Sequence, residues 1–141
     1  MKEILEFSGE YRWLSNFFMV HVTIGQLTFA STEHAYQAAK SLDPVDWKDV
    51  IECVSPGAAK RMGRNVTLRP DWEDIKLDVM REITAAKYDQ HPHLHAKLMA
   101  TKGMNLVEGN HWGDTFWGVC RGKGENHLGR IIMEYRDRHF P

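Results

Sequence analysis

The sequence predicts an α+β fold that is mainly helical, with a few short strands, formed as one domain over residues 1–141. Three observations predict this class. The chain has 141 residues, the length of one compact domain. Several segments carry apolar residues at helical spacing behind capping residues or prolines. Runs of β-branched and aromatic residues are few and short, which limits the number of strands.

Short strands are expected in three places. Residues 4–7 are predicted as a strand, and residues 8–16 as the loop that follows it. Residues 19–24 and 27–29 are predicted to form a hairpin around Gly25-Gln26, because β-branched and aromatic residues flank a glycine turn. Leu106 and Val107 are predicted as a further short strand.

Helix starts are marked by capping side chains and by prolines, which suit the first helical turn. Ser31 or Thr32 is expected to cap a helix that ends near Ser41. Further helices are expected from Asp43-Pro44, from Ser55-Pro56 to about Gly63, from Pro70-Asp71 to about Asp89, from Pro92, and from Glu125 or Asn126.

Composition and charge narrow the function classes. The chain has 18 Lys and Arg against 19 Asp and Glu, a formal net charge of -1. This balance argues against a strong nonspecific grip on nucleic acid or an anionic membrane, but it is compatible with a local basic pocket for one phosphate. No apolar run approaches the roughly 18 residues of a membrane span. The two cysteines and the absence of a signal peptide predict a cytoplasmic protein with reduced thiols, and no cofactor is expected.

The helix predicted after Ser31 carries a polar face. Glu33, Tyr36, Gln37 and Lys40 are spaced i, i+3, i+4 and i+7, which places them on one side of a helix. One interpretation is ordinary helix capping, with a carboxylate in the first turn and an amine in the last. The other is a pocket in which Glu33 is a general acid/base and Lys40 a nucleophilic amine kept neutral by its surroundings.

The long loop over residues 109–124 is a second candidate. It holds five glycines together with Trp112, Asp114, Phe116 and Trp117. Structureless loops beyond about 12 residues are uncommon in compact domains and are often functional. The aromatic rings could stack on a base, and Asp114 could bind sugar hydroxyls or act as a second carboxylate. A buried aromatic cluster that pins the loop is the alternative.

Two further segments give weaker indications, and a third argues against a metal. Residues 121–130 form a glycine-rich stretch that runs into a helix, which suits a phosphate. Arg12 and Asn16, in the first loop, could pair with a phosphate and with a ring edge, although Arg12 in solvent beside a core of Phe17 and Phe18 is the alternative. The alternating histidines at 91, 93 and 95 cannot all face one ion without distortion, so no metal site is predicted there.

Taken together, these segments resemble the NADAR family, also called YbiA-like. No single motif is specific, but five occur in the family's order and span nearly the whole chain. The matching stretches are residues 11–18 (YRWLSNFF), 31–40 (STEHAYQAAK), 58–65 (AAKRMGRN), 69–82 (RPDWEDIKLDVMRE) and 110–134 (NHWGDTFWGVCRGKGENHLGRIIME).

The resemblance implies metal-free hydrolysis of an N-glycosidic bond by a single NADAR-like domain. Two substrate classes are implied: ADP-ribose attached to guanine bases of nucleic acid, and early riboflavin-pathway intermediates that join a ribose phosphate to a pyrimidine amine. Residues 115–120 resemble those of members tied to ADP-ribose chemistry. The partner is then a small nucleotide-like substrate or an ADP-ribosylated nucleic acid.

The resemblance also implies roles for individual residues. The family's acid/base glutamate falls on Glu33, and its lysine, which attacks the opened sugar as a Schiff base, falls on Lys40. Asp114 is expected to be the further catalytic carboxylate. The residues expected to bind substrate are Arg12, Asn16, Tyr36, Gln37, Trp112, Gly113, Trp117, Gly122, Lys123, Gly124 and Asn126.

Two functions from other classes remain open at this point. A non-catalytic module that binds ADP-ribose would show tight binding without turnover. A nucleic-acid-binding protein would show an affinity that falls steeply with salt. Glu33 and Lys40 argue against the first, and the net charge of -1 argues against the second.

Overall fold

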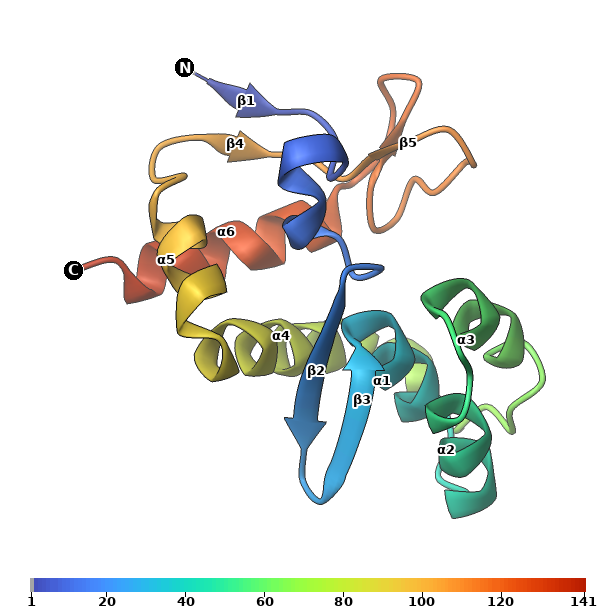
Figure 1. The fold of residues 1–141 in the computed structure, drawn as a ribbon. Coiled ribbons are helices and arrows are strands. Elements are labelled where there is room, and N and C mark those ends of the chain that lie inside the picture. The colour runs from blue at the N-terminus through green and yellow to red at the C-terminus, as the bar shows by residue number, and fades with distance from the viewer. Residues whose placement is uncertain (1) are drawn as a thin grey trace. The chain divides into compact units, whose positions relative to one another are not determined.

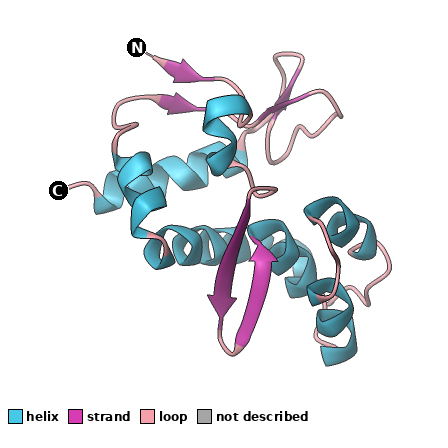
Figure 2. Ribbon diagram, viewed as in Figure 1, coloured by secondary structure: helices cyan, strands magenta, loops and turns pink. Residues whose placement is uncertain are grey.

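The computed structural model describes residues 2–141 and confirms the mainly helical α+β class (Figures 1 and 2). The chain forms two compact units: residues Asn16–Gln90, here the central unit, and the chain up to Ser15 with His91–Pro141, here the terminal unit. A single domain over residues 1–141 stays a prediction. No helix within residues 2–141 is long and apolar enough to cross a membrane.

The central unit begins with a β-hairpin and continues with four helices. Strands β2 (Met19–Ile24) and β3 (Leu27–Ser31) pair antiparallel around Gly25, whose φ of 62° supplies the turn. Helix α1 (Thr32–Ala39) follows directly, and α2 (Pro44–Ile51), α3 (Pro56–Met62) and α4 (Trp72–Gln90) complete the unit. These elements confirm the predicted hairpin and helices to within a few residues.

Short-range chemistry explains these boundaries. The Ser31 hydroxyl accepts from the His34 N–H, the Asp43 carboxylate from the Val45 N–H, and the Ser55 hydroxyl from the Ala58 N–H. Each bond satisfies an N–H group that has no partner inside its helix. Proline follows the cap of α2 and of α3, where its missing N–H costs nothing.

The terminal unit combines two small parallel pairings with helices. Strand β1 (Glu3–Ile4) pairs with β4 (Asn105–Leu106), and β5 (Gly109–Asn110) with β6 (Val119–Cys120). Helices α5 (Pro92–Met99) and α6 (His127–His139) pack apolar residues into this unit's core, among them Leu98, Ile131 and Ile132. Strand β1 is shorter than the predicted residues 4–7, and β4 is offset by one residue from the predicted Leu106-Val107. Strands β5 and β6 lie in residues 109–124, which were predicted as a loop, because such two-residue pairings depend on partners far away in the sequence.

Residues 8–16 differ from the prediction of a loop. Residues Gly9–Leu14 form a 3-10 helix, η1, and its Trp13 and Leu14 are buried. Gly9, the first residue of this helix, has a φ of 58°, which glycine adopts without steric cost. The mixture of polar and aromatic residues in this segment suggested a loop, whereas η1 is a helix whose apolar residues face the core.

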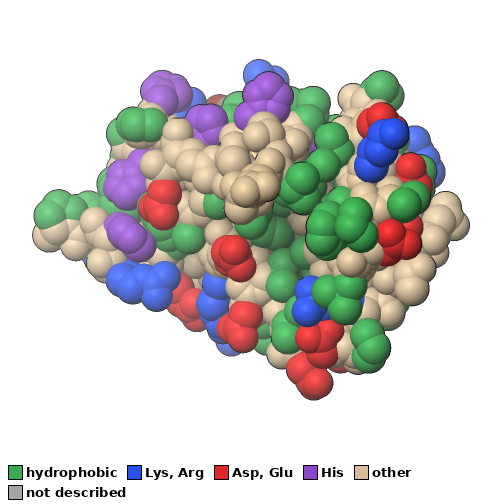
Figure 3. Space-filling view, turned by 90° about the horizontal axis from the view of Figure 1, so that it is seen from below, with side chains coloured by type: hydrophobic (Ala, Val, Ile, Leu, Met, Phe, Trp, Pro, Cys, Tyr) green, Lys and Arg blue, Asp and Glu red, His purple; other side chains and the backbone are tan. Residues whose placement is uncertain are grey.

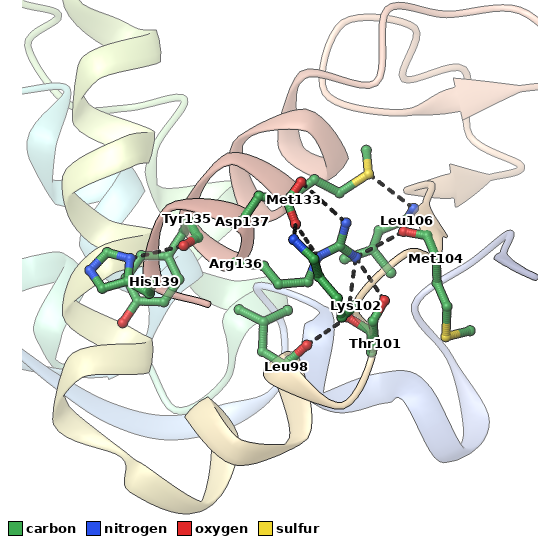
Figure 4. A network of polar contacts seen from close by, with 10 residues as sticks. All are labelled: Leu98, Thr101, Lys102, Met104, Leu106, Met133, Tyr135, Arg136, Asp137 and His139. Atoms are coloured by element: carbon green, nitrogen blue, oxygen red, sulfur yellow. Dashed lines mark hydrogen bonds and ion pairs between the residues drawn. The ribbon is translucent and has the colours of Figure 1, made fainter. Parts of the chain in front are cut away.

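A buried guanidinium ties α6 to the turn between α5 and β4. Arg136 is only 3% exposed. Its Nη1 donates to the carbonyls of Thr101 (3.0 Å) and Met104 (2.8 Å), and its Nε donates to Asp137 (2.8 Å), as Figure 4 shows. The guanidinium presents its N–H donors in a fixed planar arrangement. These donors bind two backbone carbonyls of the turn between α5 and β4.

Replacing Arg136 with Met is expected to lower the free energy of unfolding by about 3 kcal/mol, because the buried Thr101 carbonyl and the part-buried Met104 carbonyl lose a charged donor. Urea unfolding of the two proteins measures this difference. Arg138→Met, an exposed arginine on the same helix, is the matched control and is expected to change stability little. Equal stability of the wild type and Arg136→Met would show that the network contributes nothing.

Candidate active site

Helix α1 carries the polar face predicted from the sequence, and this face is buried. Glu33 is 8% exposed and Gln37 is 3% exposed, while Lys40 at the end of the helix is half-buried. On the opposite side, Ala35 and Ala38 allow close packing of neighbouring elements. A carboxylate and an amide on this face are thus screened from water, and a half-buried amine follows them at the end of the helix. Electrostatic interactions in such surroundings are stronger than in solvent.

The start of α1 is held by its two flanking segments. The Glu33 N–H donates to the Asn16 carbonyl (3.1 Å), and the Thr32 hydroxyl donates to Asn16 Oδ1 (2.9 Å). The fully buried His34 ring lies between the Ser31 hydroxyl (2.6 Å) and the Cys53 carbonyl (3.0 Å). Since a carbonyl only accepts, we assign the ring proton to Nε2 and let the Ser31 hydroxyl donate to Nδ1. These contacts fix the first turn, from which the Glu33 carboxylate projects.

The Glu33 carboxylate is bound by its neighbour one turn along the helix. Gln37 Nε2 donates to Glu33 Oε2 at 2.5 Å. A donor to a carboxylate stabilises the ionised form, and it also limits the directions in which the group can turn. Gln37, predicted to contact substrate, therefore contacts the predicted acid/base residue directly.

Lys40 lies in surroundings that favour its neutral amine. Burial is the largest effect and lowers the pKa of Lys40 below that of an ordinary lysine. Glu33 raises this pKa, and the positive charges of Lys60, Arg64 and Lys76 lower it further, so that the overall shift is downward. A neutral lysine amine is a nucleophile, whereas the ammonium form is not.

An aromatic wall lies beside this amine. Lys40 Nζ is 5.4 Å from the centroid of the Tyr36 ring, and the Tyr36 ring packs edge-on against Trp72 with centroids 5.2 Å apart. The Lys40 carbonyl accepts from the Arg69 N–H at 2.7 Å, which fixes the end of α1. Tyr36 therefore shapes the surroundings of Lys40 through its ring.

Three basic residues near Lys40 were not among those predicted: Lys60, Arg64 and, on α4, Lys76. Lys60 on α3 and Arg64 just after it lie close enough to influence Lys40. Lys60 and Arg64 are four residues apart, so they lie on one side if residues 56–64 are helical. This spacing is the feature of the sequence that could have identified them. Their proximity to Lys40 depends on how α3 packs on α1.

Residues 109–124 are not one structureless loop as predicted, because they contain β5 and β6. The loop between these two strands is held by an asparagine and an aspartate. Asn110 Nδ2 donates to the Asp114 carbonyl (2.9 Å), and Asn110 Oδ1 accepts from the Asp114 N–H (3.0 Å). Asp114 Oδ1 accepts from the N–H groups of Phe116 (3.2 Å) and Trp117 (2.9 Å). Asp114 thus shapes the loop with one carboxylate oxygen. Trp112 is 62% exposed and offers an indole face to a ring.

The glycine-rich stretch after this loop forms a tight turn. Cys120 and Lys123 exchange backbone hydrogen bonds (2.8 and 3.1 Å), and the two residues between them, Arg121 and Gly122, both have positive φ. This is the geometry of a hairpin turn, in which glycine is favoured for conformational reasons. At the start of α6, the N–H groups of His127 and Leu128 donate to the carbonyls of Phe116 and Trp117. Those donors are therefore already engaged, which weakens the phosphate interpretation of this stretch.

The Asn126 side chain links two segments of the terminal unit through hydrogen bonds. Its Oδ1 accepts from the Glu108 N–H and its Nδ2 donates to the Leu106 carbonyl, both at 2.9 Å. Both ends of the amide are thus used within the protein. The side chain joins the start of α6 to the segment that leads from β4 to β5.

The predicted residues divide between the two units. The central unit holds Asn16, Glu33, Tyr36, Gln37 and Lys40. The terminal unit holds Arg12, Trp112, Gly113, Asp114, Trp117, Gly122, Lys123, Gly124 and Asn126. Within the central unit, the structure brings Glu33, Gln37 and Lys40 to one helix face.

We expect Asp114→Asn to keep the fold and the loop, because the amide oxygen still accepts from Phe116 and Trp117, yet to lower turnover by about tenfold if the carboxylate activates water. Asp114→Ala, which removes the acceptor, is expected to lose stability as well. Melting temperature and initial rate, measured on both variants, separate the two roles. An Asp114→Asn variant with full activity would assign Asp114 to the loop alone.

A cavity of about 230 Å³ in the central unit lies on the other side of α1. It is bordered by Ala35, Ala38 and Leu42, together with Trp47 and Ile83. Glu33 and Lys40 do not line it. The cavity therefore belongs to the apolar side of α1, and the chemistry is expected on the polar side.

The histidines of the terminal unit make contacts with aromatic and polar neighbours. His95 Nδ1 lies 3.1 Å from the Tyr135 hydroxyl, and the His139 ring stacks on Tyr135 with centroids 4.0 Å apart. Within residues 2–141, no group of three or more His, Cys, Asp or Glu side chains is arranged to hold a metal ion.

In the face shown in Figure 3, acidic and basic side chains are interspersed.

Comparison with known proteins gives the class of this site. The NADAR domain family matches residues 6–139, and the chain therefore belongs to the NADAR family. N-glycosidase YbiA of Shigella boydii serotype 4 (strain Sb227) is 40% identical over 134 residues, which span 93% of this chain and 83% of that protein. N-glycosidase YbiA of Escherichia coli (strain K12) is 39% identical with the same coverage.

A solved structure and a longer relative also match the chain. The NMR structure of the E. coli protein YbiA matches with a TM-score of 0.86 and 36% identity, over 98% of this chain and 86% of that one. Riboflavin biosynthesis protein VVA0006 of Vibrio vulnificus (strain YJ016) is 37% identical over 128 residues, covering 89% of this chain but only 35% of that protein. The chain is thus an enzyme of the N-glycosidase class, a hydrolase of N-glycosyl bonds.

Proposed function

We propose that this enzyme cleaves the bond between the anomeric carbon of a phosphorylated ribose and a nitrogen atom. The candidate substrates are ADP-ribose attached to guanine bases of nucleic acid and early riboflavin intermediates in which a ribose phosphate is joined to a pyrimidine amine. The observation that carries the proposal is the face of α1, where the buried Glu33 accompanies Lys40, a lysine whose pKa is lowered.

Glu33 is the general acid/base in this proposal. Breaking a C–N bond at the anomeric carbon requires a proton for the departing nitrogen, and opening the sugar ring requires one for the ring oxygen. A carboxyl group on a rigid helix, held by Gln37, can supply that proton and take one back from water. Its place in the first turn of α1 also suits the carboxylate that remains after the transfer.

Lys40 is the nucleophile. With the ring opened, the anomeric carbon is an iminium carbon bonded to the substrate nitrogen, and the neutral Lys40 amine adds to it. The C–N bond to the base then breaks, the leaving nitrogen takes a proton, and a Schiff base joins Lys40 to the sugar. Water adds to this Schiff base and releases the free sugar and the amine, so that the net reaction consumes one water.

The charges around Lys40 support an anionic substrate. Lys60, Arg64 and Lys76 place positive charge on this side of a chain whose net charge is only -1. Such a local cluster attracts a phosphate group without making the whole surface basic. Both candidate substrates carry phosphate, so this feature supports their common class and does not choose between them.

The residues of the terminal unit enter as further proposals. The exposed Trp112 indole is proposed to stack on a base, since stacking tolerates any ring with a π face. Asp114 is proposed to activate the water that releases the sugar. Arg12 and Lys123 are exposed and are proposed to contact phosphate.

The test is a cleavage assay with two substrates, guanine-ADP-ribosylated DNA and the ribosylamino-pyrimidine phosphate. Each is incubated with the enzyme with and without borohydride, which reduces a Schiff base to a stable adduct on the protein. Release of ADP-ribose or ribose phosphate is expected, and the substrate that turns over identifies the subclass. Binding of ADP-ribose without turnover of either substrate would instead indicate a non-catalytic binding module.

A further inference from the structure

Gly63, which ends α3, lies directly against the side chain of Gln37 on α1. Its φ of −58° is a conformation that any residue adopts, so the backbone does not require glycine here. A Cβ atom at this position would overlap Gln37 Oε1 and would lie 2.7 Å from Gln37 Cδ. The close approach of the Gln37 amide is therefore what requires glycine at position 63.

The position of the Gln37 amide gives Glu33 a hydrogen-bond donor but does not satisfy both ends of the amide itself. Its Nε2 donates to the Glu33 carboxylate, whereas its Oε1 is buried and has no hydrogen-bond partner among residues 2–141. An unpaired buried carbonyl is unfavourable, and each one in a native protein calls for an explanation. Here the explanation is that the amide is oriented by the carboxylate on one side and accommodated by Gly63 on the other.

We propose that Gln37 is the positioning residue for Glu33, and that Gly63 provides the space that keeps Gln37 in place. This inference rests on the proposed role of Glu33 as acid/base. With Oε2 held by the amide, Glu33 transfers its proton through Oε1. Because α1 and α3 pack together through this contact, the orientation of the carboxylate is set by a glycine on another helix.

Three variants test the proposal, together with a control in the same helix. Gln37→Met keeps the length of the side chain but removes the donor, and Gly63→Ala displaces the amide. Each is expected to lower kcat by about 10²-fold, the scale of a misplaced catalytic group, with KM nearly unchanged. Gly57→Ala is the control, because a Cβ there would meet only Arg61 Nη1 at 3.7 Å and Ser55 Oγ at 3.9 Å.

The third variant, Gln37→Ala, tests the steric part of the proposal. Without the Gln37 amide, a methyl group at position 63 has no amide to displace. Gly63→Ala should therefore cost activity and stability in the wild type but little in the Gln37→Ala background. An equal loss in both backgrounds would show that Gly63 acts through something other than Gln37.

The ionisation of Glu33 provides a readout that is independent of turnover. Its side-chain carboxyl carbon can be followed by ¹³C NMR as the pH is changed. Losing a donor disfavours the ionised form, so the titration midpoint of Glu33 is expected to move to higher pH in Gln37→Met and in Gly63→Ala, but not in Gly57→Ala. The other charged groups around this face, Lys40, Lys60, Arg64 and Lys76, are present in every variant.

Turnover and the Glu33 titration midpoint together distinguish a failure of the proposed function from a failure of the positioning proposal. If the wild type cleaves no N-glycoside while the Glu33 midpoint moves as expected, the proposed function is wrong but the positioning contact stands. If Glu33 titrates identically in the wild type, Gln37→Met and Gly63→Ala, the positioning proposal is overturned whatever the activity.

Discussion

Glu33→Gln is expected to reduce kcat by about 10³-fold while leaving substrate binding nearly intact, because the amide cannot donate or accept the catalytic proton. The substitution keeps the size of the side chain and its place on α1. It also keeps an oxygen that can accept from Gln37 Nε2, so the local structure is expected to remain. Single-turnover rates on the preferred substrate, together with binding measured by calorimetry, separate the chemical step from binding.

The matched control is Glu52→Gln, which changes an exposed glutamate at the end of α2 by the same chemistry. It is expected to have wild-type kcat and KM. A Glu33→Gln enzyme with a normal kcat would remove Glu33 from the reaction and leave only its structural place in the first turn of α1.

Lys40→Met is expected to abolish the borohydride-trapped adduct and to lower kcat by at least about 10²-fold, since the variant has no amine to form the Schiff base. Wild-type enzyme incubated with substrate and borohydride should gain the mass of the reduced sugar on Lys40. Lys48→Met, an exposed lysine on α2, is the control and should trap and turn over like the wild type. Near-full activity in Lys40→Met would remove the covalent step and leave a direct hydrolysis without a Schiff base.

The lowered pKa of Lys40 also fixes the direction of the pH dependence. The amine is nucleophilic only when neutral, so the limb of the rate profile that reports Lys40 should rise with pH and have its midpoint below the ordinary lysine value of about 10.4. Between the folded and unfolded pKa values, the unfolded chain binds more protons, so stability rises with pH in that window. Lys40→Met should remove that slope and be at least as stable as the wild type at neutral pH. Urea unfolding at several pH values measures both effects.

Local chemistry in the sequence was sufficient for most elements. Ser31, Asp43 and Ser55 mark helix starts because each side chain accepts from an N–H group two or three residues later. The turn at Gly25 likewise sets the hairpin. Strand β1 and η1 were less accurately predicted, because a two-residue pairing with β4 and the burial of Trp13 depend on distant residues.

The candidate site likewise combines features that local sequence predicts with features that depend on other information. Helical periodicity alone puts Glu33, Gln37 and Lys40 on one face, since these positions are four and three residues apart. Resemblance to the NADAR family added the roles of Glu33 and Lys40, which the spacing does not contain. The glycine-rich stretch was harder to interpret, because glycines that serve a turn, such as Gly122, look in the sequence like glycines that approach a ligand.

By itself, the sequence determined the helices, the hairpin and the polar face of α1, because capping, turn geometry and periodicity act between residues close together in the chain. Only the tertiary structure decided that this face is buried, that Lys60 and Arg64 lie near Lys40, and that Gly63 accommodates Gln37. Burial and the proximity of charges arise when α3 and α4 pack against α1, and these two effects lower the pKa of Lys40. The presence of Glu33, Gln37 and Lys40 on one helix face is thus a local property, whereas the burial of this face and the lowered pKa of Lys40 are produced by packing.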